Sequence, residues 1–278
     1  MTTDGRLALH TLRRGVPGQL PLVLLHAFPV DHRMWWDVTD LLPGERTVLA
    51  PDLPGFGTSP SGPDVAAALG ADPAVASIDV MGDGVVATLR TAGVGRAVVA
   101  GLSMGGYVAL SMLERHPDLV AGLGLLDTKA TADDDAARER RLEVARQVRA
   151  EQRVEAVYGM RTSVLGATNR VARPDLVERV FGWIGDQGPS AVAWAQEAMA
   201  ARPDRTALLG AYTGPSLVVV GEEDELAPVD VARGMSDELP DSDLVIVPRS
   251  GHMTSIESPQ PVASGLSRLL RRAEAATA

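Results

Sequence analysis

The chain has 278 residues, of which 45% are hydrophobic, and its formal net charge at pH 7 is -10. This size suits one compact domain with an inserted subdomain, and the acidic balance argues against nucleic acid or an anionic membrane surface as a partner. The absence of cysteine excludes disulfides, thiolate metal sites and thiol nucleophiles. Lys129 is the only lysine, and it lies in no motif for a phosphate-binding lysine or a cofactor Schiff base.

The first residues of the chain show no basic start followed by an apolar run. No stretch of the sequence reaches the length of a membrane span. We therefore expect a cytoplasmic protein that acts on a small molecule and uses neither a metal ion nor another cofactor. The sequence leaves the oligomeric state open.

Short apolar runs rich in β-branched residues alternate with longer helix-like segments. The first run, 6–14, alternates apolar and polar residues as an antiparallel edge strand does. Further strands are predicted at 21–27, 46–52, 97–101, 120–127, 216–224 and 243–248. Helices are predicted at 31–42, 77–91, 104–115, 228–239 and 259–275. This alternation predicts an α/β fold, a mostly parallel twisted sheet with helices on both faces.

The strand pattern stops between residues 129 and 211. This stretch begins with a long charged amphipathic helix, and the next strand is predicted only at Ser216. We expect a helical insertion at 129–211 in a core formed by 1–128 and 212–278. Ordinary crossover helices are the alternative, although these usually need far fewer residues.

One serine occupies a sharp turn in "VVAGLSMGG", residues 98–106. Ser103 follows a predicted strand and precedes a predicted helix, so it lies at the carboxyl edge of the sheet, where ligands bind in such folds. Gly101 and Gly105 stand two positions away on either side, as a strained nucleophile turn requires. The N–H of Met104, at the positive end of the helix, is a candidate oxyanion donor. The alternative is a turn that simply favours glycine and serine.

A serine nucleophile needs a histidine base, and the chain has five histidines. His252 lies in a loop after the last predicted strand, at the same sheet edge as Ser103. Three other histidines fall on a predicted strand or helix, and the fourth ends a strand in a loop for which a backbone role is the better explanation; these are His10, His32, His116 and His26. We therefore predict that His252 is the base.

Three acids, Glu222 to Asp224, follow another predicted strand at that edge. A solvated turn is the alternative for such a run, but Ser103, Asp224 and His252 stand in the chain order typical of this serine turn. Asp224 is the predicted orienting acid and Asp127, after the preceding strand, is the alternative. The loop after the strand 21–27 supplies the second candidate oxyanion donor, the N–H of Phe28.

Five motifs in order closely resemble those of the α/β-hydrolase superfamily, in particular its lid-bearing serine hydrolases. These include 3-oxoadipate enol-lactonase-like esterases and cofactor-free haloperoxidase-like perhydrolases. The matching stretches are "HAFPVDHRMW", "DLPGFGTS", "GLSMGG", "GEEDELAP" and "SGHMTSIESP". Ala27 departs from the pattern, because the family usually has glycine there, and this departure bears on the geometry of the Phe28 amide.

The resemblance implies that residues 129–211 form a helical cap over the active site. Four side chains of this segment are candidates for the substrate pocket, with packing inside the cap as the alternative for each: Tyr158, Met160, Trp183 and Trp194. The implied reaction is hydrolysis of a small-molecule ester or lactone through an acyl-enzyme. The same triad also permits perhydrolysis, C–C bond hydrolysis or acyl transfer. A ligand-sensing receptor with slow turnover is the alternative of another class.

Overall fold

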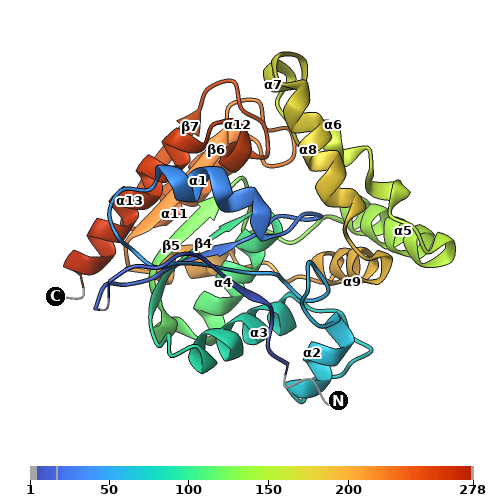
Figure 1. Ribbon diagram of the computed structural model, residues 1–278, viewed down its shortest axis with the longest axis horizontal. Helices are drawn as coiled ribbons and strands as arrows, with labels where there is room; N and C mark the ends of the chain where they lie inside the picture. Colours follow the sequence, from blue (N-terminus) through green and yellow to red (C-terminus); the bar gives the residue numbers. More distant parts are fainter. Residues whose placement is uncertain (1–4, 17, 277–278) are drawn as a thin grey trace.

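The computed structural model describes residues 5–16 and 18–276. In these residues a seven-stranded sheet has the order β1-β3-β2-β4-β5-β6-β7 (Figure 1). β1 pairs antiparallel with β3, and the other neighbours are parallel. The strands are β1 (Leu9–Arg13), β2 (Leu22–Leu25), β3 (Val48–Pro51), β4 (Ala97–Leu102), β5 (Val120–Leu126), β6 (Ser216–Gly221) and β7 (Ser242–Val247). The predicted α/β fold with an antiparallel edge strand is confirmed.

Helices cover both faces of the sheet (Figure 1). α1 (Trp36–Leu41) packs against α13 (Pro259–Ala275), and α3 (Ile78–Thr91) packs against α4 (Met104–Arg115). α11 (Val229–Glu238) lies against β6 and β7. The shorter elements around them are η1 (His32–Trp35), α2 (Gly62–Ala68), η2 (Pro117–Leu119) and α12 (Thr254–Glu257).

The structure departs from the sequence prediction at two helices. The predicted helix 31–42 is split into η1 and α1, and Asp31 caps η1 by accepting the N–H of Arg33. The helix α2 was not predicted. It begins at Gly62 and Pro63, with Ser61 as its cap, and it spans only seven residues, too few for a clear helical repeat.

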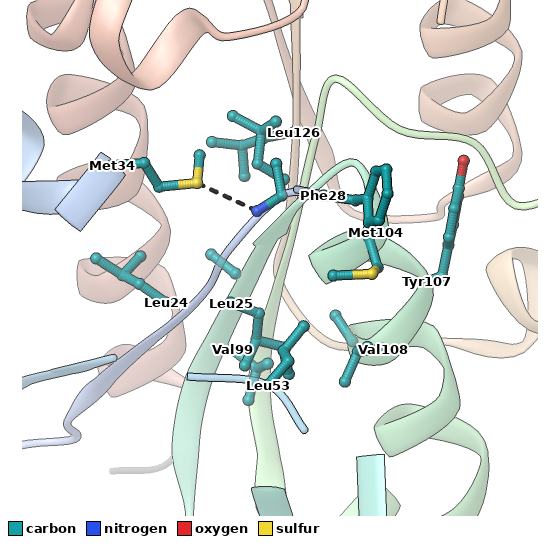
Figure 2. Packing of buried hydrophobic residues seen from close by; sticks show 14 of the residues in the cluster. Leu24, Leu25, Phe28, Met34, Leu53, Val99, Met104, Tyr107, Val108 and Leu126 are labelled. Carbon is teal, nitrogen blue, oxygen red and sulfur yellow. Dashed lines mark hydrogen bonds between the residues drawn. The ribbon is translucent and has the colours of Figure 1, made fainter. Parts of the chain in front are cut away.

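The central strands are buried on both faces, which explains their continuous apolar sequences. In Figure 2, Val99 of β4 faces Met104 and Val108 of α4 across a packed core. The loop after β2 is anchored in the same core, because the N–H of Ala27 donates to Sδ of Met34 at 3.1 Å (Figure 2).

Residues 129–211, called the cap segment below, form helices and no strand, and the structure describes all of them. In Figure 1, α5 to α8 stand to one side of the sheet, and α9 packs along α5. The elements are α5 (Asp135–Glu151), η3 (Glu155–Val157), α6 (Met160–Ser163), α7 (Ala167–Ala172), α8 (Pro174–Gly185), α9 (Pro189–Ala200) and α10 (Thr206–Ala211). Gln187 of this segment donates to Asp31 at 2.9 Å, which ties it to the loop after β2.

The buried carboxylate of Asp52 connects three parts of the core. It accepts from Nε2 of His10 on β1 and from Nδ1 of His32 in η1, each at 2.8 Å. The two imidazole rings stack with their centroids 3.4 Å apart. Burial pushes the pKa of Asp52 upward, but the hydrogen bonds from the side chain and the backbone N–H of His32 act against burial, and that pKa lies well below its ordinary value.

We predict that Asp52→Asn lowers the melting temperature at pH 7 by roughly 4–8 °C, because a charge-assisted hydrogen-bond network is lost. The lowered folded-state pKa means that the Asp52 charge stabilises the fold above about pH 4, and that this contribution disappears as the pH falls further. The variant should therefore lose less stability than the wild type on acidification. Thermal unfolding between pH 7 and pH 3 measures both effects. Asp118→Asn, at an exposed position, is the matched control. Equal melting temperatures of the two variants across this pH range would contradict a stabilising role of the Asp52 charge.

Candidate active site

The turn at Ser103 is built from backbone that only glycine neighbours permit. Ser103 has φ 54° and ψ -113°, between the end of β4 and the first residue of α4. A Cβ placed on Gly101 would lie 2.0 Å from the carbonyl oxygen of Gly105, and one on Gly105 would lie 2.2 Å from that of Leu25. No side chain fits at either position, so the two glycines let the strand, the turn and the helix approach closely.

The structure brings together the three side chains predicted for the site. Oγ of Ser103 lies 2.8 Å from Nε2 of His252, and Nδ1 of His252 lies 2.8 Å from Oδ2 of Asp224. The other oxygen of Asp224 accepts the N–H groups of Leu226 and Ala227 at 2.8 and 3.0 Å. The Asp224 side chain is fully buried, whereas Ser103 reaches a cavity. A hydroxyl, an imidazole and a carboxylate thus form one hydrogen-bonded chain.

Asp127, the alternative acid, is fully buried but makes no hydrogen bond to His252. Its carboxylate accepts the N–H of Gly221 at 3.0 Å and both the N–H and the hydroxyl of Thr254. Burial and the neighbouring Asp224 raise the pKa of Asp127 well above its ordinary value. Asp127 therefore connects the end of β6 to the segment after His252. The loop after β6 carries Asp224, so Asp127 joins the two loops that hold Asp224 and His252.

The other histidines have partners away from Ser103. His26 is fully buried, and its Nε2 accepts the N–H of Leu53 at 2.8 Å. Burial lowers the pKa of His26, which suits a neutral ring that joins the loops after β2 and β3. His116 pairs with Asp83 at 2.7 Å. His10 and His32 share Asp52, and these three are the only group of possible metal ligands found among the described residues.

Two backbone amides close to the serine are the predicted oxyanion donors. Phe28, in the loop after β2, lines the cavity that holds Ser103 and His252, and Met104 is the first residue of α4. Neither N–H donates to a partner among the described residues. Figure 2 shows the Phe28 ring beside Met104. Ala27, where the family usually has glycine, is completely buried with its N–H held by Met34.

The cavity at Ser103 has a volume of about 400 Å³ and lies between core loops and the cap segment. Phe28, Ser103 and His252 form its core side. The cap segment contributes apolar side chains from three helices, namely Val144, Met160 and Met199. This size suits a small-molecule ligand.

Of the four predicted pocket residues, Met160 lines this cavity and the three aromatic ones do not. Tyr158 packs edge-on against Phe181, with ring centroids 4.8 Å apart. Trp183 is 7% exposed and lies under the guanidinium groups of Arg33 and Arg179. Trp194 is buried against Gly62, where a Cβ would come within 2.2 Å of its ring. Their large apolar surfaces stabilise the cap segment and its contacts with the core.

The cavity also contains charged side chains that the sequence analysis did not select, above all Lys129 and Arg140. Lys129 follows the carboxyl end of β5 by three residues, so its place at the ligand-binding edge was the signal that could have identified it. Arg140 lies in the charged helix α5, where nothing in the sequence distinguishes it from the neighbouring arginines.

Comparison with known proteins identifies the family. The model of the α/β hydrolase fold family matches residues 21–259, and the chain belongs to this family. A thermophilic esterase from Thermogutta terrifontis is 34% identical, with a TM-score of 0.86 and coverage of 96% of this chain and 93% of the esterase. The dihydrolipoyllysine-residue acetyltransferase component of an acetoin cleaving system from Pseudomonas putida is 29% identical, over 96% of this chain and 68% of its own.

The enol-lactonase from Burkholderia xenovorans shares the fold at 22% identity, with a TM-score of 0.78 and coverage of 95% of this chain and 96% of the lactonase. None of the helices in the described part of the chain has the length and apolar character needed to cross a membrane.

We predict that Gly101→Ala destabilises the protein by about 3 kcal/mol and abolishes activity, because the added methyl group must displace the backbone that carries Ser103. Denaturant unfolding and ester hydrolysis measure the two effects. Gly95→Ala is the matched control, since a Cβ there meets no atom within 4 Å. A Gly101→Ala protein with wild-type stability and activity would show that the turn does not need this close approach.

Proposed function

We propose that this protein is a serine hydrolase that cleaves a carboxylic ester or lactone of a small molecule. The observation that carries the proposal is the continuous hydrogen-bonded chain from Ser103 through His252 to Asp224. Its Ser103 end lies in a cavity of small-molecule size. The 34% identical esterase supports hydrolysis of an ester. We also propose that the cap segment, residues 129–211, covers this site as a lid and that residues 1–128 and 212–278 form the catalytic core.

In the first half of the reaction, the Ser103 hydroxyl donates to Nε2 of His252 and attacks the carbonyl carbon of the substrate. His252 takes the proton and becomes an imidazolium, which the negative charge of Asp224 stabilises through Nδ1–H. The carbonyl oxygen becomes an oxyanion. The free N–H groups of Phe28 and Met104 donate to it, and the positive end of α4 adds to this stabilisation.

In the second half, His252 returns the proton to the leaving alkoxide, so that an alcohol departs and an acyl group stays on Ser103. With a lactone, the new hydroxyl remains attached to the acyl group. A water molecule then donates its proton to His252 and attacks the acyl carbon. Collapse of the second oxyanion releases the carboxylic acid, and His252 returns its proton to Oγ of Ser103, which restores the hydroxyl.

We predict that Ser103→Ala lowers kcat for p-nitrophenyl acetate by roughly 10⁴- to 10⁶-fold, because the nucleophile is removed while the rest of the site remains. Steady-state kinetics measures the change, and circular dichroism checks that the variant is folded. Ser163→Ala, an exposed serine in α6, should keep wild-type kinetics. Unchanged hydrolysis by Ser103→Ala would overturn the assignment of the nucleophile.

The two buried acids are predicted to behave differently. Asp224→Asn should lower kcat by about 10⁴-fold, since an amide can no longer hold the imidazolium in its productive form. Asp127→Asn should lower kcat by less than about tenfold, because Asp127 makes no hydrogen bond to His252 and an amide oxygen can still accept from the loops that it joins. Steady-state kinetics of both variants measures the contrast. A larger kinetic loss for Asp127→Asn would make Asp127 the acid of the reaction.

A further inference from the structure

The cavity beside Ser103 contains a cation that the protein itself does not neutralise. Lys129, the only lysine in the chain, lines the cavity together with Ser103 and His252. It is partly buried, and it has no hydrogen-bond or ion-pair partner among the described residues. An ammonium group in such a place loses hydration without gaining a counter-ion, so an anion that enters the cavity gains a favourable interaction with it.

The acid Asp133, which lines the same cavity, is already engaged by other cations. Asp133 accepts from Nε of Arg141 at 2.6 Å and from Nη2 of Arg202 at 2.8 Å. Burial pushes the pKa of Asp133 upward, but these two guanidinium groups hold it at about 2. Arg202 is buried and lies 4.1 Å from the centre of the Tyr107 ring, which fixes its position. Burial and the charge of Arg202 lower the pKa of Lys129, and the opposing charge of Asp133 does not bring that pKa back to its ordinary value.

A second free cation faces the same space. Arg140 of α5 lines the cavity and has no partner among the described residues. The one free acid of the wall is Glu225, which is exposed. Arg140 is also exposed, and no acid among the described residues pairs with Lys129 or Arg140, in a chain whose net charge is -10. Apolar groups such as Val144 and Met160 occupy other parts of the wall.

We propose that the substrates are esters or lactones that carry a free carboxylate, and that Lys129 and Arg140 bind this carboxylate as the residues that determine specificity. The inference rests on the proposed hydrolysis and names the substrate class. In such a substrate, the reacting carbonyl would lie at Ser103 and the free carboxylate at Lys129 and Arg140. A short apolar chain between the two groups would lie against the apolar part of the cavity wall. The ammonium and the guanidinium are both donors suited to a carboxylate.

The test compares mono-p-nitrophenyl adipate with the neutral p-nitrophenyl heptanoate. The adipate chain is too long for its carboxylate to attack its own ester through a five- or six-membered ring. We expect kcat/KM of the wild type to favour the adipate ester by roughly tenfold or more, mainly through KM. Lys129→Met should reduce this preference by roughly tenfold and Arg140→Met by about threefold, whereas Lys129→Arg should restore part of it.

Arg138→Met is the matched control, because Arg138 is an exposed residue of the same helix that does not line the cavity. It should retain the wild-type preference. A neutral ester that is hydrolysed as well as the adipate ester, or a Lys129→Met variant that loses both activities equally, would overturn the proposal and leave the hydrolase assignment intact.

Two further measurements do not depend on turnover. Monomethyl adipate should bind to Ser103→Ala in calorimetry and bind much more weakly to the Ser103→Ala, Lys129→Met double variant. Without ligand at pH 7, Lys129→Met should melt roughly 2 °C higher than the wild type, because the lowered pKa of Lys129 shows that folding disfavours its charge. This gain should shrink as the pH rises through the lowered pKa of folded Lys129 toward the ordinary value of 10.5.

The outcomes separate the two proposals. Failure to hydrolyse either ester, with binding of monomethyl adipate that depends on Lys129, would overturn the hydrolase and support the carboxylate site. Failure of hydrolysis together with no binding would overturn both. A lower melting temperature for Lys129→Met would show that Lys129 stabilises the fold, against the proposed role.

Discussion

The backbone turn at Ser103 is the constraint on which the rest of the site depends. Its positive φ costs of order 1–3 kcal/mol, and the surrounding structure must offset that strain. The N–H of Ser103 donates to the carbonyl of Leu126 at 2.9 Å, and the hydroxyl of Thr128 donates to the carbonyl of Ser103 at 2.8 Å. The N–H and the carbonyl of Ser103 are thus both held by residues at or just after the carboxyl end of β5.

The same short stretch after β5 connects the other parts of the site. Thr128 holds the serine turn, Asp127 joins the loops of Asp224 and His252, and Lys129 contributes a cation to the cavity. Three consecutive residues therefore hold the turn of Ser103, join the loops of Asp224 and His252, and line the cavity. A change in this stretch therefore alters several parts of the site at once.

Sequence reasoning succeeded where the determining pattern is local. The sheet follows from β-branched runs, and the serine turn follows from two glycines at fixed spacing. The choice between Asp224 and Asp127 does not follow from a local pattern, because each acid follows a strand at the same edge of the sheet. Only the structure shows that Asp224 contacts His252, whereas Asp127 accepts the N–H of Gly221. The segment 216–224 was expected to be extended throughout, but β6 ends at Gly221 and the acids beyond it form the turn that places Asp224.

The cap segment was the hardest part to interpret from sequence. Its aromatic residues were natural candidates for a pocket, yet Trp194 packs against Gly62 of α2, a contact between residues 132 positions apart that no periodicity reveals. The charge of the pocket was equally hidden. Lys129 stands close to Asp133 in the sequence, and only the structure shows that Asp133 is occupied by Arg141 and Arg202.

The most direct test of the central claim is to trap the acyl-enzyme. The wild type is mixed with p-nitrophenyl acetate, quenched in acid within the first turnovers, digested and analysed by mass spectrometry. The account predicts one added acetyl group on the peptide that contains Ser103, and none on that peptide in Ser103→Ala. Hydrolysis that proceeds with no acetyl group on Ser103, or with the acetyl group on another residue, would contradict it.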